Sequence, residues 1–264
     1  MSGSIKLSSP DTGEFWEIGI SYEDPHLLVI HKPSGLLSSP DRYDPNRPNL
    51  MRLLHRDVER GAKWVRDRQV DYLMNVHRLD FETSGLIVLA KSKPVLTHLT
   101  NQFGSDKTIK FYSAIVQGAP REERFQIDAA LAPHPRNPAV IRVDSKQGKK
   151  SSTEFEVLQR FRGYALLSCR PLTGRTHQIR VHATFAGYPL VGDKVYGGGP
   201  LFLSHLKPGY KPKPGESEKP LMGRVALHAE RLQFLHPITG ETVAVEAPRP
   251  KDFEVALKYL SRFA

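Results

Sequence analysis

Residues 75–92, NVHRLDFETSGLIVLAKS, hold the side chains best suited to acid–base chemistry. His77, Arg78 and Asp80 stand shortly before a glycine and an apolar run. In an extended loop, Arg78 and Asp80 would project to one side and Leu79 to the other. Leu79 would then anchor the loop in a core while an acid and a base face a cleft. Taken alone, the motif favours a simpler interpretation, a polar turn that caps a strand.

Two further motifs contain a lysine. Lys110 and Tyr112 of KFY share one face of a predicted strand, and Phe111 lies on the opposite face. A lysine beside an aromatic ring suits a stacked base with its phosphate nearby, although a tyrosine in a strand is usually a packing residue. In HKPSG, residues 31–35, a tight turn is predicted to place Lys32 at its mouth.

A helix is predicted over residues 174–187, GRTHQIRVHATFAG. His177 and Arg180 are three residues apart, so they would share one face of this helix. The predicted apolar side consists of Ile179, Ala183 and Ala186. Arg180 would then point at a carboxylate in a cleft, or else lie on the surface of an amphipathic helix.

Several chemistries lack their motifs. The sequence has no GxxxxGK[ST] phosphate loop, which argues against nucleoside triphosphate chemistry. His177 and His182 are five residues apart rather than four, and neither HExxH nor paired cysteines occur, so no metal site is predicted. A serine nucleophile has no elbow motif here.

The charge of the chain favours a polyanionic partner. The 264 residues include 38 Lys and Arg against 28 Asp and Glu, a net charge of +10 with a pI near 9.7. Each phosphate contact by a cation releases counterions, so this surplus suits RNA or DNA. Cys169 is the only cysteine, which rules out an internal disulfide. With no signal peptide and no apolar run of about 18 residues, a cytoplasmic protein without a membrane partner is expected.

Spacing and capping signals predict an α+β fold on a mixed, mostly antiparallel sheet with flanking helices. Asn49 and Ser92 are predicted N-caps of helices that follow them, and Asp252 is predicted to cap the last helix. Strands are predicted over residues 27–30, 85–91, 108–118, 153–161, 164–171, 224–237 and 241–247. A Pro-, Gly- and Lys-rich insert at 197–221 is predicted to be an exposed, partly mobile loop.

Taken together, the motifs resemble those of an RluA-type pseudouridine synthase, in the compact form without an S4 domain. The resemblance runs from about residue 23 to residue 250 and rests on HKPSGLL, HRLDFETSGLIVLAK, KFYSAIVQG, LTGRTHQIRVHATFAGYPLVGD and LHAERLQFLHPITGE, in this order. Two features depart from the family pattern. Phe81 and Glu82 replace a more usual basic–acidic pair, and the insert at 197–221 is longer than in the smallest members.

The resemblance implies an enzyme that isomerises uridine in ribosomal or transfer RNA to pseudouridine without a cofactor. The C1′–N1 bond breaks, the base turns, and C5 bonds to C1′. Asp80 matches the catalytic aspartate, acting either on C1′ or as a base towards a sugar proton. Arg180 matches the arginine that pairs with this aspartate, and Tyr112 matches the tyrosine that stacks on the flipped uracil.

Three further substrate-binding residues follow from the same resemblance. Arg78 matches the arginine that fills the gap left by the extruded base, a step needed because a stacked base cannot rotate. Lys110 and Leu227 are carried over to pocket-wall or phosphate roles. The expected organisation is a short arm, residues 1–21, and one catalytic domain, residues 22–264. The protein is expected to act as a monomer on a structured stem-loop of rRNA or tRNA.

Two other functions remain open from the residues alone. A non-catalytic RNA-binding module would keep the fold without turnover. A hydrolase that cleaves a glycosidic bond would need paired carboxylates. Glu82 is the acid nearest to Asp80, and it would share the Asp80 face of an extended loop.

Overall fold

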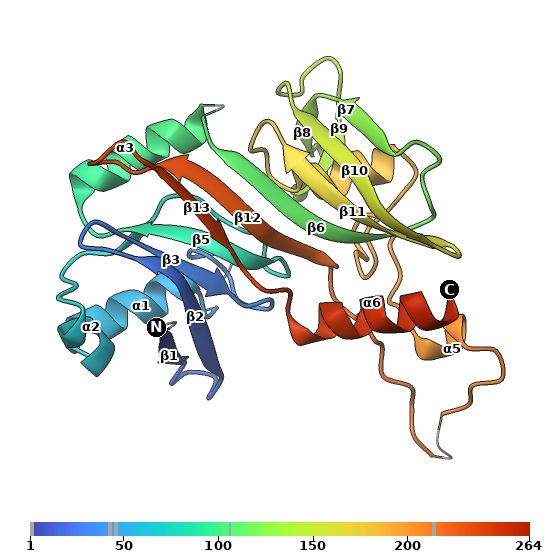
Figure 1. The fold of residues 1–264 in the computed structure, drawn as a ribbon, viewed down its shortest axis with the longest axis horizontal. Helices are drawn as coiled ribbons and strands as arrows, with labels where there is room; N and C mark the ends of the chain where they lie inside the picture. Colours follow the sequence, from blue (N-terminus) through green and yellow to red (C-terminus); the bar gives the residue numbers. More distant parts are fainter. Residues whose placement is uncertain (1–2, 42–43, 45–46, 106, 213–214) are drawn as a thin grey trace. The chain divides into compact units, whose positions relative to one another are not determined.

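The computed structural model describes residues 3–41, 44, 47–105, 107–212 and 215–264 (Figure 1). The chain forms two compact units, each made of two separate stretches. Unit 1 comprises Met1–Lys110 and Ala229–Pro248, and unit 2 comprises Phe111–His228 and Arg249–Ala264. The division into an arm and one domain at residue 21 stays a prediction, and that position falls inside a strand.

Unit 1 is built on a sheet whose neighbouring strands are β1 (Ser4–Ser8), β2 (Phe15–Glu23), β3 (Leu27–Lys32), β5 (Ser84–Ala90) and β12 (Leu227–Leu235). The pairs β1–β2, β2–β3 and β3–β5 are antiparallel. The short β4 (Met74–Asn75) pairs with β5, and β13 (Thr242–Glu246) pairs antiparallel with β12. The fold is therefore α+β with a largely antiparallel sheet, as predicted.

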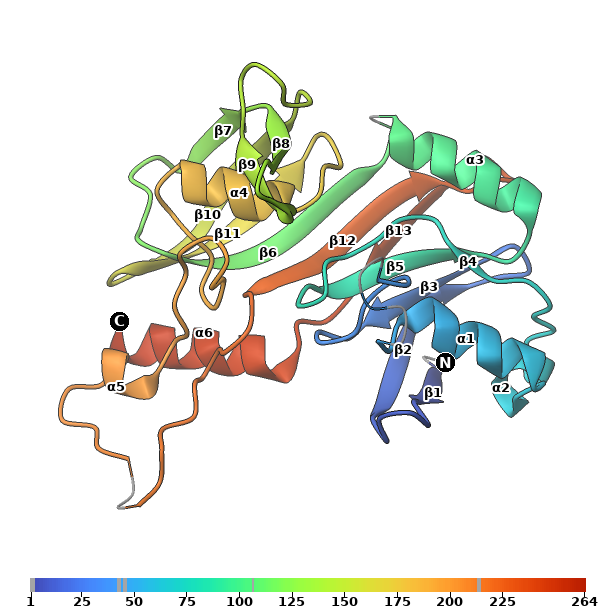
Figure 2. The ribbon, with the colours of Figure 1, turned by 180° about the vertical axis from the view of Figure 1, so that it is seen from behind.

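The continuous apolar run GLIVLA follows from burial of β5 on both faces. Ile87 and Leu89 pack with α1 (Leu50–Glu59) and α2 (Lys63–Asp67), whereas Leu86 and Val88 pack with α3 (Lys93–Gly104). Alternate residues of a strand face opposite sides, so each side needs its own apolar set. Figure 2 shows these helices beside the strands of unit 1.

Both predicted N-caps of unit 1 are confirmed. Asn49 Oδ1 accepts a hydrogen bond from Arg52 N at 2.9 Å at the start of α1. Ser92 Oγ accepts from Val95 N at 3.5 Å at the start of α3. Each side chain satisfies an amide that has no partner within its helix.

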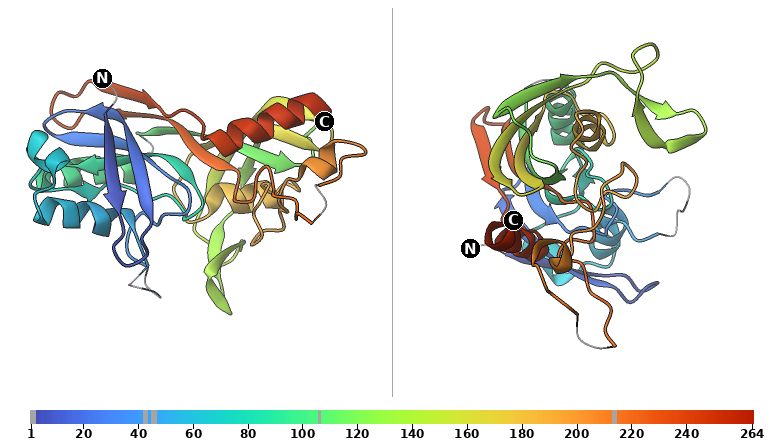
Figure 3. Two further views of the ribbon diagram at one scale, coloured as in Figure 1. Left: turned by 90° about the horizontal axis from the view of Figure 1, so that it is seen from below. Right: turned by 90° about the vertical axis from the view of Figure 1, so that its right-hand side faces the viewer.

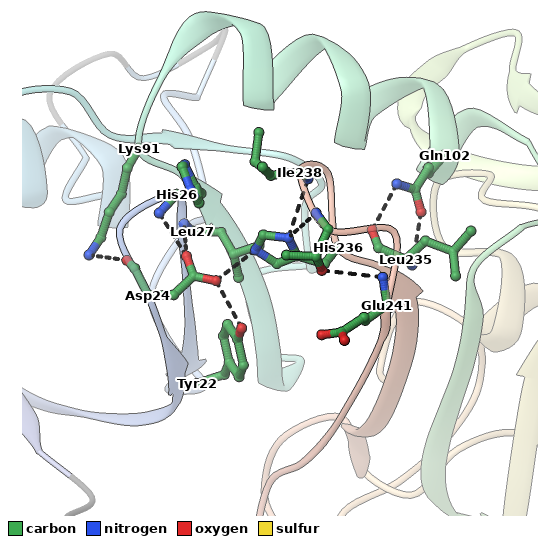
Figure 4. Close-up of polar contacts among 11 residues, drawn as sticks. Tyr22, Asp24, His26, Leu27, Lys91, Gln102, Leu235, His236, Ile238 and Glu241 are labelled. Carbon is green, nitrogen blue, oxygen red and sulfur yellow. Dashed lines mark hydrogen bonds and ion pairs between the residues drawn. The ribbon is translucent and has the colours of Figure 1, made fainter.

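A buried histidine ties the two stretches of unit 1 together (Figure 4). His236 Nε2 donates to Asp24 Oδ2 at 2.7 Å, and His236 Nδ1 accepts from Ile238 N at 3.2 Å. Tyr22 donates to the same carboxylate, and burial, followed by this hydrogen bond, raises the pKa of Tyr22 to about 12. Burial of Asp24 favours its neutral form, but hydrogen bonds from main-chain amides outweigh it and lower the pKa of Asp24.

Unit 2 is an antiparallel sheet with helices. Its strands are β6 (Ile109–Gln117), β11 (Tyr164–Pro171), β10 (Ser152–Phe161) and β7 (Arg124–Asp128), in that order, with β8 (Leu131–His134) and β9 (Asn137–Val143) forming a separate hairpin. One apolar cluster contains residues of α4 (Gln178–Phe185), and another contains residues of α6 (Lys251–Phe263). The short α5 (Leu203–Leu206) lies beside α6 (Figure 3).

Three local predictions need correction. α4 begins at Gln178 rather than near residue 174, because His177 adopts a left-handed conformation with φ of 53°. Asp252 lies in the first turn of α6, where Pro250 is the N-cap residue, and it binds Arg224 instead. The insert is not wholly exposed, since Leu201 and Leu206 are buried; residues 213–214 of it lie outside the described chain.

No helix within the described residues is both long enough and apolar enough to span a bilayer.

Candidate active site

The loop of Asp80 is held through the main chain of its neighbour Leu79. The Leu79 side chain is buried, Asp80 is half-buried and Arg78 is exposed, as expected for an extended loop anchored by its central residue. Ser38 Oγ donates to Leu79 O at 2.8 Å and accepts from Leu79 N at 3.0 Å. One buried hydroxyl thus satisfies both polar groups of Leu79 and fixes the loop beside β5.

The HKPSG turn clamps the residues that follow Asp80. Ser34 Oγ donates to Glu82 O at 2.7 Å, and Gly35 N donates to Phe81 O at 2.9 Å. Gly35 has a positive φ of 78°, which favours glycine at this turn. The loop is therefore fixed on both sides of Asp80 by residues more than 40 positions earlier in the chain.

Lys32 is buried rather than placed at the mouth of its turn, which corrects the sequence prediction. Its side chain is 1% exposed. The ammonium donates to Leu36 O at 2.7 Å, Pro33 O at 2.8 Å and Phe81 O at 3.3 Å. A buried ammonium needs such acceptors to offset its lost hydration. Lys32 therefore joins the turn to the loop of Asp80.

His77 serves as an uncharged support for the same loop. Its Nε2 accepts a hydrogen bond from Val88 N at 3.2 Å, and its ring stacks on Phe103 at 4.7 Å between centroids. Desolvation, together with the nearby charge of Lys110, lowers the pKa of His77 to about 3. An acceptor nitrogen must be unprotonated, so the hydrogen bond and the pKa agree. His77 is a packing residue rather than one of the charges of the motif.

In unit 2, the guanidinium of Arg180 binds a carboxylate that the sequence analysis did not assign. Arg180 Nε donates to Asp193 Oδ2 at 2.7 Å, and Nη2 donates to Asp193 Oδ1 at 2.9 Å. The two side chains are 6% and 1% exposed. Two parallel bonds between a guanidinium and a carboxylate fix the orientation of both groups. The only signal for Asp193 was its place at the end of the LVGD motif, with no partner apparent from spacing.

Tyr196 braces this ion pair from one side. The Arg180 guanidinium carbon lies 4.9 Å from the centroid of the Tyr196 ring. The Tyr196 hydroxyl contacts His177 Nδ1 at 2.8 Å and accepts from Ile141 N at 2.9 Å. The prediction that His177 and Arg180 share a helix face is wrong, because His177 precedes the helix. His177 instead positions the tyrosine that packs on Arg180.

The remaining predicted site residues also divide between the units. Lys110 ends the first stretch of unit 1, with its ammonium 5.9 Å from the centroid of Phe103. Tyr112 lies on β6 and is half-buried, and Leu227 is buried in the same apolar cluster. Unit 1 therefore holds Arg78, Asp80 and Lys110, and unit 2 holds Tyr112, Arg180 and Leu227. The pairing of Arg180 with Asp80 stays a prediction.

No three His, Cys, Asp or Glu side chains in the described part of the chain are grouped so that they would hold a metal ion. Cys169 is fully buried, and this burial raises the pKa of its thiol well above the ordinary value. A thiol that stays protonated is a poor nucleophile, so Cys169 has a packing role.

Comparisons with known proteins all identify one protein family. Residues 26–184 match the family model described as RNA pseudouridylate synthase. Ribosomal large subunit pseudouridine synthase D of Xylella fastidiosa is 39% identical over 242 residues, which cover 89% of this chain and 67% of that protein. The protein of the same name from Xanthomonas campestris is 37% identical over 245 residues, covering 90% of this chain and 67% of that protein.

Two solved structures share the fold. Human RNA pseudouridylate synthase domain containing 1 is 26% identical with a TM-score of 0.62, covering 88% of this chain and 84% of that one. Human RNA pseudouridylate synthase domain containing 4 is 23% identical with a TM-score of 0.67, covering 92% of each chain.

Proposed function

The chain belongs to the RNA pseudouridylate synthase family and is an RNA pseudouridine synthase, and from that premise we propose that Asp80 is its catalytic residue. The observation that supports this assignment most directly is the clamped loop. Ser38 and the HKPSG turn hold the main chain on both sides of Asp80, so the carboxylate is carried at a fixed position. A group held in place before the substrate arrives lowers the entropic cost of reaching the transition state.

The reaction is an isomerisation in which no atom is gained or lost overall. The C1′–N1 bond of the target uridine breaks, the uracil turns, and a C1′–C5 bond forms. C5 then loses its hydrogen and N1 gains one. Asp80 takes part in this reaction as a carboxylate anion. It either bonds to C1′ or removes a proton from the sugar.

The substrate is proposed to be a structured stem-loop of ribosomal RNA. The similar proteins from Xylella and Xanthomonas are named as ribosomal large subunit enzymes, which favours rRNA over tRNA. The surplus of ten positive charges supplies the sequence-independent part of RNA affinity. The enzyme is proposed to work as a monomer in the cytoplasm.

The other site residues are proposed to act on the flipped base and its surroundings. Arg78 is the exposed residue of the loop, and it fills the gap that the extruded uridine leaves. Tyr112 stacks on the uracil, while Lys110 and Leu227 contribute to the pocket wall. Arg180, already oriented by Asp193, is proposed to bind Asp80 as well.

Tritium release tests the role of Asp80. C5 must lose its hydrogen, so RNA transcribed with [5-³H]uridine releases tritium on isomerisation. Asp80→Asn should abolish release, a loss of at least about a thousandfold, while RNA affinity in filter binding stays within about twofold because one carboxylate barely alters the charge of the surface. Asp71→Asn, at an exposed position of unit 1, is the matched control and should retain the activity of the wild type. Comparable turnover by Asp80→Asn would overturn the assignment.

Base flipping by Arg78 is tested with two RNAs that share one target sequence, a folded stem-loop and a short single strand. Extrusion costs a few kcal/mol in a duplex and less in an unpaired strand. Arg78→Ala should therefore slow single-turnover isomerisation more on the stem-loop. Equal losses on both RNAs would instead identify Arg78 as a phosphate contact, which would also reduce the salt dependence of binding.

A further inference from the structure

An open hollow of about 580 Å³ lies in unit 1, and its lining includes Asn75, which precedes the HRLD motif in the chain. Residues of α1, of β4 and of the short segment Ser39–Pro40 line it. Its volume is within the range of about 300–1,000 Å³ that small-molecule sites occupy. None of the residues assigned above to catalysis or uracil binding is among its lining residues.

One wall of the hollow is basic. Arg52, His55, Arg56 and Glu59 recur at intervals of three and four residues, so they share one face of α1. Within the described chain, the Arg56 guanidinium makes no ion pair. Arg52 lies 3.6 Å from the carboxylate of Asp11, and both side chains are about half exposed, so the pair is weak. Arg56 can therefore bind an anion, and a planar guanidinium suits a phosphate.

Part of the remaining lining is apolar. This part consists of Met51, Met74 and Pro40. Met51 lies at the start of α1, and its side chain is only 3% exposed. Thioether side chains are flexible and pack well against aromatic rings. A nucleotide carries a phosphate and an aromatic base. The arginines suit the phosphate, and the apolar lining suits the base.

Hydrogen bonds connect this hollow to the proposed catalytic loop. Ser39 Oγ donates to Asn75 Oδ1 at 3.3 Å, and Asn75 Nδ2 donates to His77 O at 2.8 Å. Ser38, which precedes Ser39, holds Leu79. The lining of the hollow is thus continuous with the main chain that carries Asp80.

We propose that the hollow binds one nucleotide of the substrate RNA that flanks the flipped uridine. Arg52 and Arg56 bind its phosphate, and Met74 and Pro40 contact its base, above the buried Met51. The proposal rests on the proposed function, because Asp80 sets where the flipped uridine lies. A nucleotide held here would fix the register of the RNA strand and so contribute to the choice of target uridine.

Methionine methyl NMR tests binding at the hollow without relying on turnover. The chain has four methionines, of which Met51 and Met74 line the hollow and Met222 is buried in unit 2. Full-length Asp80→Asn protein labelled with [methyl-¹³C]methionine is titrated with a single-stranded oligoribonucleotide of five uridines. The Met51 and Met74 signals should shift with one common dissociation constant, and the Met222 signal should not move.

Two charge variants in the same background separate this site from general attraction to RNA. Arg52→Gln/Arg56→Gln should raise the dissociation constant about tenfold, as expected for loss of charge-assisted contacts to one phosphate, and should remove the methyl shifts. Arg66→Gln, an exposed position on α2 outside the hollow, should change the dissociation constant less than about twofold and keep the shifts.

Three results would overturn the proposal: no Met51 and Met74 shifts on addition of the oligouridylate, shifts that persist in Arg52→Gln/Arg56→Gln, or equal affinity for uridine monophosphate and the oligouridylate. The last would identify a site for free nucleotides. These results are independent of tritium release, so failure of the hollow and failure of Asp80 as the catalytic residue are distinguishable.

Discussion

The two ionisable residues at the centre of the proposed site, Asp80 and Arg180, are positioned by different means. Asp80 is placed through its main chain, by Ser38 and the HKPSG turn acting on neighbouring peptide groups. Arg180 is placed through its side chain, by a buried bidentate pair with Asp193. Main-chain hydrogen bonds therefore hold the loop of Asp80, whereas the charge of a second side chain orients Arg180.

The largest expected effect comes from breaking the buried pair. Asp193→Ala removes the carboxylate that forms the buried bidentate pair with Arg180, and removing one partner of a buried ion pair costs about 3–5 kcal/mol. The free energy of unfolding should fall by this amount in urea denaturation. Asp252→Ala is the matched control, since it breaks the Arg224–Asp252 pair of the same unit, whose carboxylate side chain is 42% exposed. That change should cost no more than about 1 kcal/mol.

A double variant sharpens this test. In Arg180→Leu/Asp193→Ala both members of the pair are removed, so the loss of stability should be smaller than the sum of the losses in the two single variants. If the two single losses in the free energy of unfolding simply added up in the double variant, the two side chains would not be coupled. The contrast between Asp80 and Arg180 would then disappear.

A smaller effect is expected from acid, through His77. Its pKa is about 3 in the folded protein against an ordinary 6.5, so between these values the unfolded chain binds more protons. Stability is therefore retained above pH 6.5 and lost as the pH falls towards 3, by about 1.4 kcal/mol per pH unit. His77→Gln should reduce the loss between pH 6.5 and pH 5 by about 2 kcal/mol in denaturation curves.

His98, exposed on α3, provides the control for this pH dependence. His98→Gln should leave the slope of stability against pH unchanged. An unchanged slope in His77→Gln as well would mean that His77 is not kept neutral by its surroundings, and the support under the Asp80 loop would need a different explanation.

The smallest expected effect on stability comes from the clamp itself. Ser38→Ala removes both hydrogen bonds to Leu79 and leaves a buried peptide group unsatisfied, at a cost of about 1–2 kcal/mol. The rate of isomerisation should fall about tenfold because Asp80 is displaced, with the KM for RNA nearly unchanged. Ser105→Ala, at an exposed residue after α3, should change neither quantity. A normal rate in Ser38→Ala would show that the clamp does not position Asp80.

Local signals in the sequence predicted much of the fold. Asn49 and Ser92 start helices where their capping side chains indicated, and the apolar run of β5 is buried throughout. The order of motifs led to the family, and spacing within HRLD correctly placed Leu79 inward. These features depend on residues within a few positions of one another.

The errors and omissions involve contacts between residues far apart in the chain. Nothing near Ser38 indicates that it will bond Leu79, 41 residues later. Asp193 follows Arg180 by 13 residues, across a turn whose geometry no periodicity describes. The start of α4 was misplaced because His177 adopts a left-handed conformation that few residues other than glycine favour.

The interleaving of the two units has a consequence for how the protein is made. Each unit takes its second stretch from the last part of the chain, Ala229–Pro248 for unit 1 and Arg249–Ala264 for unit 2. Asp24 and His236 are 212 positions apart, so their hydrogen bond can form only late in synthesis. Neither unit can complete its core while the ribosome is still translating residue 228. A chain that stopped there would leave apolar strand edges of both units exposed, and it would be a substrate for proteases and chaperones rather than a smaller enzyme.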